Sequence, residues 1–174
     1  MTTHSSDPYS INKALLASLQ HLIIDGHNVL FGCSPFFGHY KAPEFPGSSN
    51  RQLLINASQA LTETYSQMDI QLWFDGSAHF VSQPTNHLRV MYSGGEGKGR
   101  ADREMIKSLI YLKSQGAGLR AIVTADKGLQ RSARKNGAVI LLPEEFSRLL
   151  VPVKESAQKA VQNPPAAPPA IASV

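Results

Sequence analysis

The sequence is poor in cysteine and in long apolar runs, and each scarcity narrows the kinds of protein it can encode. Its 174 residues include one cysteine, Cys33, so an internal disulfide framework is excluded and a reducing compartment is expected. No apolar run approaches the roughly 20 residues that span a bilayer. The polar N-terminus lacks the basic and then apolar pattern of a secretory signal. We therefore expect a cytoplasmic protein with no membrane partner.

The composition is that of a globular protein with a modest basic excess. Hydrophobic residues make up 42% and charged residues 17% of the chain, enough for one ordinary domain with a core. The net charge of +4 does not by itself indicate binding to nucleic acid. If several of the acids gather in one site, however, the remaining surface is more basic than the total suggests.

Two terminal segments differ from the rest of the chain. Residues 1–10 are polar and are predicted to be a disordered lead-in. Residues 151–174 contain five prolines and six alanines, a composition typical of a disordered tail. The sequence thus predicts one folded domain over residues 11–150.

Apolar strands and amphipathic helices alternate through the predicted domain. Strands are expected at 22–25, 70–74, 88–92, 119–123 and 138–142, and helices at 11–19, 50–68, 101–115 and 127–136 and from Pro143 onward. Two long loops, 31–49 and 93–100, connect them; the aromatic residues of the first are expected to pack onto the body or to stack RNA bases. This alternation predicts an α/β fold with a mostly parallel sheet of about five strands, covered on both faces.

Four aspartates stand at comparable places. Asp25, Asp75 and Asp126 each follow an apolar strand, and Asp102 opens a helix after a glycine-rich loop. Because parallel strands end at one edge of a sheet, the four can converge there. Crowded carboxylates raise one another's pKa unless a cation lies among them, and Mg²⁺ or Mn²⁺ suits oxygen ligands. The alternatives are helix caps at Asp102 and Asp126 and a turn at Asp75.

The same aspartates lie in four ordered motifs. These are Ile24-Asp25-Gly26-His27-Asn28, Trp73-Phe74-Asp75, Arg100-Ala101-Asp102 and Val123-Thr124-Ala125-Asp126. In this order, over Leu22 to Leu150, they resemble the YacP-like NYN family, a branch of the PIN-like nucleases. The resemblance implies a three-layer α/β/α fold and a metal-dependent endoribonuclease whose acidic cluster holds Mg²⁺ or Mn²⁺ and whose partner is RNA, including ribosome-associated mRNA or rRNA.

Site roles follow from the resemblance position by position. Asp25, Asp102 and Asp126 are the implied metal cluster, with Asp75 as a further acid. Asn28 is implied as a catalytic polar residue, and Thr124 as a hydroxyl near the third acid.

Two positions depart from the family pattern. His27 stands where many relatives have tyrosine, and Arg103 where many have a second acid after the Ala-Asp pair. Glu104, one residue further, points about 100° away on the helix. The loss of an acid makes weaker metal binding an open alternative.

Basic residues flank two of the aspartates. Those expected to contact RNA are Lys98, Arg100, Arg103, Lys127 and Arg131, because positive side chains around an acidic pocket let a phosphate backbone approach. A solvated helix face is the alternative. The loop 93–100 does not match a phosphate-binding P-loop, since Gly99 follows Lys98, and is expected to be a flap or a plain linker.

Other chemistry is less well supported. The histidines show no zinc-ligand spacing, and Cys33 lacks the pattern of a nucleophile. His27 is a candidate for proton transfer or RNA contact, or is simply hydrogen-bonded in its loop. The leading hypothesis is therefore a metal-dependent endoribonuclease, and the alternative is a non-catalytic RNA-binding module with the same fold. A phosphoryl-transfer enzyme for small substrates ranks last, because no second acid follows two residues after Asp25.

Overall fold

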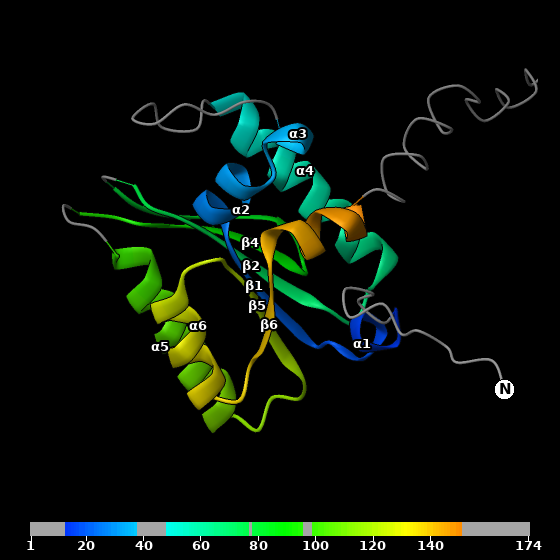
Figure 1. Cartoon of the computed structure of the whole chain (residues 1–174), viewed down its shortest axis with the longest axis vertical. Helices are drawn as coiled ribbons and strands as arrows, with labels where there is room; N and C mark the ends of the chain where they lie inside the picture. The colour runs from blue at the N-terminus through cyan, green and yellow to red at the C-terminus, as the bar shows by residue number, and fades with distance from the viewer. Residues whose placement is uncertain (1–12, 38–47, 77, 96–98, 151–174) are drawn as a thin grey trace, which may run out of the picture.

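The computed structural model describes residues 13–37, 48–76, 78–95 and 99–150 (Figure 1). Its strands are β1 (His21–Asp25), β2 (Asp69–Phe74), β3 (His79–Thr85), β4 (Leu88–Ser93), β5 (Arg120–Val123) and β6 (Val139–Leu141). Its helices are α1 (Lys13–Ser18), α2 (Gly26–Gly32), α3 (Ser34–Phe37), α4 (Ser48–Thr64), α5 (Arg100–Ser114) and α6 (Lys127–Lys135). A last helix begins at Pro143 and is described as far as Leu150.

The strands form one six-stranded sheet in the order β3-β4-β2-β1-β5-β6. All neighbours are parallel except β3 and β4. The five predicted strands are therefore confirmed, and the sheet has one more. The missed strand, β3, forms an antiparallel hairpin with β4 at the edge of the sheet. Most of its residues are exposed and it contains Pro84, so it shows no apolar alternation and carries a residue confined to sheet edges.

Helices cover both faces of the sheet, as predicted. Leu22 and Ile24 of β1 point into a core shared with α1, α2, α4 and the last helix. Ile23, between them, points into a second core under α5 and α6. Figure 1 shows these two helical layers on opposite sides of the sheet. The result is the predicted three-layer α/β/α architecture, with its central strands buried on both faces.

The prediction for the segment after β1 was wrong in one respect. No loop follows Asp25: the strand passes directly into α2, whose first residue is Gly26 and whose N-cap is Asp25. The φ of Gly26 is not positive. Glycine is needed there for space, because a Cβ would lie 2.3 Å from the Phe74 ring and 2.8 Å from the Trp73 carbonyl oxygen.

The predicted loop 31–49 is partly helical. It contains the end of α2, all of α3 and the start of α4. Phe37 is buried and Phe36 packs against the same core, so these two aromatic residues pack onto the body. Residues 38–47, with Tyr40 and Phe45, lie outside the described residues, as do 1–12, 96–98 and 151–174.

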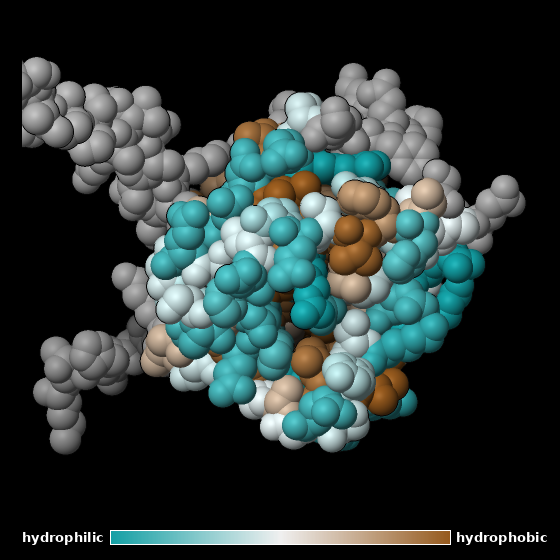
Figure 2. Space-filling view, turned by 180° about the vertical axis from the view of Figure 1, so that it is seen from behind, coloured by the Kyte–Doolittle hydropathy of each residue, from teal (hydrophilic) through white to brown (hydrophobic). Residues whose placement is uncertain are grey.

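The surface is mainly hydrophilic. Figure 2 shows polar residues over most of one face, with apolar residues only in small groups. Within the described residues, no helix is long and apolar enough to cross a membrane. Cys33 is buried, and its thiol contacts the Pro143 carbonyl oxygen at 3.0 Å. Burial raises the pKa of this thiol to about 11, so it stays protonated at neutral pH.

Candidate active site at the carboxyl edge of the sheet

Asp25 is the buried carboxylate of this edge, with only 6% of its surface exposed. One oxygen accepts the backbone N–H of Asn28 at 3.1 Å, and the other accepts the Asn28 amide at 2.6 Å. Burial raises the pKa of Asp25 to about 6, the negative charge of Asp102 adds to the rise, and the hydrogen bonds from Asn28 and Thr124 oppose it. The carboxylate is thus held in one orientation in an environment that disfavours its charge.

Thr124 connects Asp25 to the end of the neighbouring strand. Its hydroxyl donates to Asp25 at 3.1 Å and accepts the backbone N–H of Asp126, also at 3.1 Å. The carbonyl of Thr124 accepts the buried Gln130 amide at 2.9 Å, which fixes the peptide. Asp25 and Asp126 are therefore joined through one fully buried hydroxyl group.

Asn28 closes the same network from α2. Its side-chain oxygen accepts the backbone N–H of Ala125 at 3.2 Å while its amide donates to Asp25. Asp126 caps α6 by accepting the Leu129 N–H at 2.6 Å. The helix-cap alternative for Asp126 is thus realised, although the cap occupies only one of its two oxygens.

Two further aspartates of this edge are Asp75, which follows β2, and Asp102, in the first turn of α5. Asp75 accepts the Ser93 hydroxyl at 3.3 Å and the backbone N–H of Ala101 at 3.2 Å, which connects β2 to β4 and to the start of α5. Asp102 lies in the first turn of α5 and is half-buried, and its side chain forms no hydrogen bond with another described residue. Burial raises its pKa, and the charges of Asp126 and then Asp75 raise it further, while Arg103 opposes them.

The electrostatics of this edge fit a hard divalent cation. Asp102 interacts with Asp25, Asp75 and Asp126, so four carboxylates from four separate segments share one region of negative potential. Among the described residues, no three His, Cys, Asp or Glu side chains are close enough to enclose an ion as they stand. The donors are nevertheless all oxygen, and a carboxylate that accepts hydrogen bonds keeps further lone pairs for a metal.

His27 lies at the edge of this group. Its Nδ1 accepts the backbone N–H of Asp75 at 3.4 Å, and its ring packs edge-on against Phe74 at a centroid distance of 5.7 Å. Burial and the charge of Arg51 lower its pKa, against the opposing effect of Asp75. His27 is therefore a neutral, hydrogen-bonded residue at neutral pH.

Most of the basic residues predicted to bind RNA are at the surface. Arg103, Lys127 and Arg131 are exposed, and Arg100 is half-buried. Lys98 lies outside the described residues. Arg103 follows Asp102 directly, and Glu104 is paired with Lys107 at 2.7 Å. Glu104 is thus engaged on the helix surface, away from the position that the expected second acid would take.

Sequence reasoning missed Arg51 at the start of α4. Its guanidinium carbon lies 5.6 Å from the centroid of the Phe74 ring and 5.7 Å from that of Tyr92. Its Nε is buried and has no hydrogen-bond partner among the described residues. The partners are distant in sequence, so no local pattern indicates this cation near His27.

The hydroxyl of Thr124 gives a first prediction. In Thr124→Val the shape is retained, but Asp25 loses a donor and the Asp126 N–H loses an acceptor. We expect the pKa of Asp25 to rise further, above its value of about 6, and the free energy of unfolding to fall by about 1–3 kcal/mol. NMR titration of the carboxyl group and urea unfolding measure these changes, with Thr124→Ser as the control that keeps the hydroxyl. An unchanged Asp25 pKa in the valine variant would contradict the role given to this hydrogen bond.

A mostly parallel six-stranded sheet between two helical layers, with aspartates at its carboxyl edge, is a three-layer α/β/α arrangement of the PIN-like class. The comparison with known families narrows this class. The family model of the YacP-like NYN domain matches residues 22–170. The chain therefore belongs to the YacP-like NYN domain family, as its four motifs suggested.

Solved structures support the same fold. The chain is similar to the crystal structure of Rae1 (YacP) from Bacillus subtilis, with 21% sequence identity and a TM-score of 0.62; the match covers 83% of this chain and 80% of that one. The crystal structure of a tryptophan-to-leucine mutant of the same Bacillus subtilis protein gives the same identity and TM-score and is covered to 82%. No curated protein sequence matches the chain.

Proposed function

We propose that this protein is a metal-dependent endoribonuclease that hydrolyses phosphodiester bonds of single-stranded RNA. One observation carries the proposal: Asp102 interacts electrostatically with three other aspartates brought from β1, β2 and the end of β5. Stability alone does not explain four like charges at a ligand-binding edge, because each carboxylate raises the pKa of the others. Membership of a family with a PIN-like ribonuclease fold supports the same reading.

The bound ion would be Mg²⁺ or Mn²⁺, held by Asp25, Asp102 and Asp126 with Asp75 nearby. When bound, such an ion lowers the pKa of a water molecule and neutralises charge on the phosphate. Asn28 and Thr124 keep the Asp25 carboxylate in a fixed orientation through their hydrogen bonds. Preorganisation of this kind is what a reacting group requires.

The basic residues would guide the RNA to this edge. Arg100 and Arg103 flank Asp102, and Lys127 and Arg131 follow Asp126, with Lys98 in the preceding loop. Contacts of these cations with phosphates release counterions, so RNA binding should weaken as salt rises. Ribosome-associated mRNA or rRNA would supply accessible single strands, and the family assignment supports RNA as the substrate class.

The proposal is tested by incubating the purified protein with a labelled unstructured RNA and Mn²⁺, beside an EDTA control. We expect internal cleavage that requires the metal. Addition of Mn²⁺ should also raise the melting temperature, because a ligand that binds only the folded state stabilises it. RNA that stays intact under all metal conditions would contradict the proposal.

The second candidate is an RNA-binding module that does not cut. Arg103 in the place of an acid, and the engagement of Glu104 by Lys107, favour it. The same assay separates the two functions. A pure binding module would shift the RNA on a gel equally well with Mn²⁺ or EDTA and leave it intact.

A further inference from the structure

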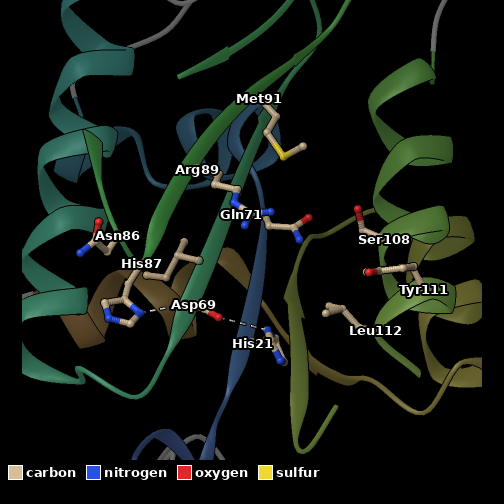
Figure 3. A pocket seen from close by; sticks show the side chains of 11 residues that line it. His21, Asp69, Gln71, Asn86, His87, Arg89, Met91, Ser108, Tyr111 and Leu112 are labelled. Atoms are coloured by element: carbon tan, nitrogen blue, oxygen red, sulfur yellow. Dashed lines mark hydrogen bonds and ion pairs between the residues drawn. The ribbon is translucent and has the colours of Figure 1, made fainter. Parts of the chain in front are cut away.

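Figure 3 shows a cavity of about 400 Å³. It is lined by the first residues of β1 and β2 and by the β3–β4 turn, so it lies at the opposite end of the sheet from the four aspartates of the candidate active site. Its volume is within the range of about 300–1,000 Å³ usual for small-ligand sites. Figure 3 shows its two walls: Ser108 and Tyr111 project from α5, and Asp69, Gln71, His87 and Arg89 come from the strands and the β3–β4 turn. The cavity lies between α5 and the face of β2 and β4.

The walls of the cavity combine an aromatic ring, hydrogen-bonding groups and a cation. Tyr111 is 63% exposed, so its ring is available to a ligand. Asp69 is an acceptor held between two imidazoles, at 2.8 Å from His87 and 3.9 Å from His21. The Gln71 side-chain oxygen accepts from Trp73 at 3.3 Å, which leaves its NH₂ group as a donor. Arg89 forms no ion pair with another described residue.

An aromatic face, hydrogen-bonding groups and an unpaired cation together suit one nucleotide. Unstacked bases of single-stranded RNA are bound by stacking on aromatic side chains and by hydrogen bonds to their edges, and an arginine can take the phosphate. Tyr111 would supply the stacking face, Asp69 and Gln71 the edge contacts, and Arg89 the phosphate contact.

The cavity also lies along the same helix and strand as the candidate active site. Tyr111 is nine residues after Asp102 on α5, about 14 Å along a helix, and Gln71 is four residues before Asp75, about 13 Å along a strand. Arg103, Lys107 and Tyr111 are spaced four residues apart and all exposed, so they follow one face of α5. Two cations therefore lie along the path between the two places.

We propose that this cavity, the distal pocket lined by Asp69, Gln71, Arg89 and Tyr111, binds an unpaired nucleotide of the RNA whose cleavage site lies at the aspartates. This inference rests on the proposed function for its ligand class. It makes the substrate a single strand several nucleotides long that runs along α5. A strand that reaches both places gains affinity over one that reaches only the aspartates.

The test is a binding measurement that does not depend on cleavage. The full chain is titrated in EDTA against a fluorescent unstructured oligoribonucleotide long enough to reach both places, and against a labelled trinucleotide. We expect Tyr111→Ala to weaken binding of the longer RNA by about five- to a hundredfold, the usual effect of losing a stacking side chain. Arg89→Gln should make the slope of log K against log salt less steep by about 0.7.

Two matched controls keep the result specific. Ile110→Ala removes an apolar side chain, 50% exposed and adjacent on α5, that does not line the pocket. Arg134→Gln removes an exposed arginine of α6. Both should bind the longer RNA as the wild type does, and the wild type should bind the trinucleotide, which is too short to reach both places, more weakly than the longer RNA.

The outcomes separate this inference from the proposed function. Cleavage by the wild type together with equal binding by Tyr111→Ala and Ile110→Ala would overturn the pocket and leave the nuclease standing. Selective loss of binding in Tyr111→Ala, without any cleavage by the wild type, would support the pocket and overturn the nuclease. A wild type that binds no RNA overturns the pocket as well.

Discussion

Asp25→Asn is expected to reduce metal-dependent RNA cleavage at least about a hundredfold. Loss of a group that merely supports a metal ligand costs about 10- to 100-fold, and Asp25 is proposed as a ligand itself. The amide is nearly isosteric and stays within reach of Asn28 and Thr124, so the fold should persist. Cleavage rates with Mn²⁺, beside circular dichroism spectra of both proteins, measure the effect. A variant that cuts at the wild-type rate would exclude Asp25 from the site.

The same substitution has a pH signature in the metal-free protein. The pKa of Asp25 is raised from 3.8 to about 6, so the folded state binds this proton more tightly than the unfolded state does. The contribution of Asp25 to stability therefore falls as pH rises from about 4 through about 6. Relative to the wild type, Asp25→Asn should gain about 2 kcal/mol between pH 4 and pH 7.

Urea unfolding in EDTA at the two pH values measures this gain. The comparison is a difference between two proteins, so the other titrating groups cancel to first order. The single hydrogen bond that the amide cannot reproduce lowers stability at both pH values and also cancels. A difference that is independent of pH would show that Asp25 titrates normally.

Gly26→Ala is expected to destabilise the protein by about 3 kcal/mol, at the upper end of overpacking effects. The added Cβ would meet the ring of Phe74, which is fully buried, and the backbone oxygen of Trp73. Neither can move without shifting β2. For a chain of this size the loss lowers the melting temperature by roughly 6–12 °C.

Gly118→Ala is the matched control for this clash. Its Cβ would also lie 2.3 Å from a neighbour, but that neighbour is the end of the exposed Gln20 side chain, which can rotate away at the cost of one exposed hydrogen bond to the Gly118 N–H. We expect a melting temperature close to that of the wild type, measured by calorimetry for both variants. Equal effects of the two substitutions would show that β2 accommodates the methyl group at Gly26.

The parts of the fold that the sequence predicted are those with a strong local signal. Strand β1 contains a continuous apolar run, β2 is apolar except for Gln71 after its first residue, and α5 and α6 have apolar residues at helical spacing. The edge strand β3 was missed because neither of its faces is buried. Helix α2 was missed because it is short and begins with glycine, and its stability depends on the Asp25 cap and on burial of Val29 and Leu30.

The candidate site also has residues that the sequence predicted and contacts that it did not. The aspartates could be found because each follows a recognisable strand or opens a helix, and the parallel topology then brings them together. The contact of Arg51 with Phe74 and Tyr92 could not be found, because it joins residues far apart in sequence. The distal pocket depends on how α5 packs against β2 and β4, which no motif indicates.

The direct passage from β1 into α2 has a consequence for how the chain can change. Asp25 is at once the last residue of a central strand and the cap of a helix, so no flexible segment separates it from the core. An inserted or deleted residue at this junction would rotate α2 relative to the sheet and carry Asn28 away from Asp25. The junction therefore tolerates substitution but no change in length.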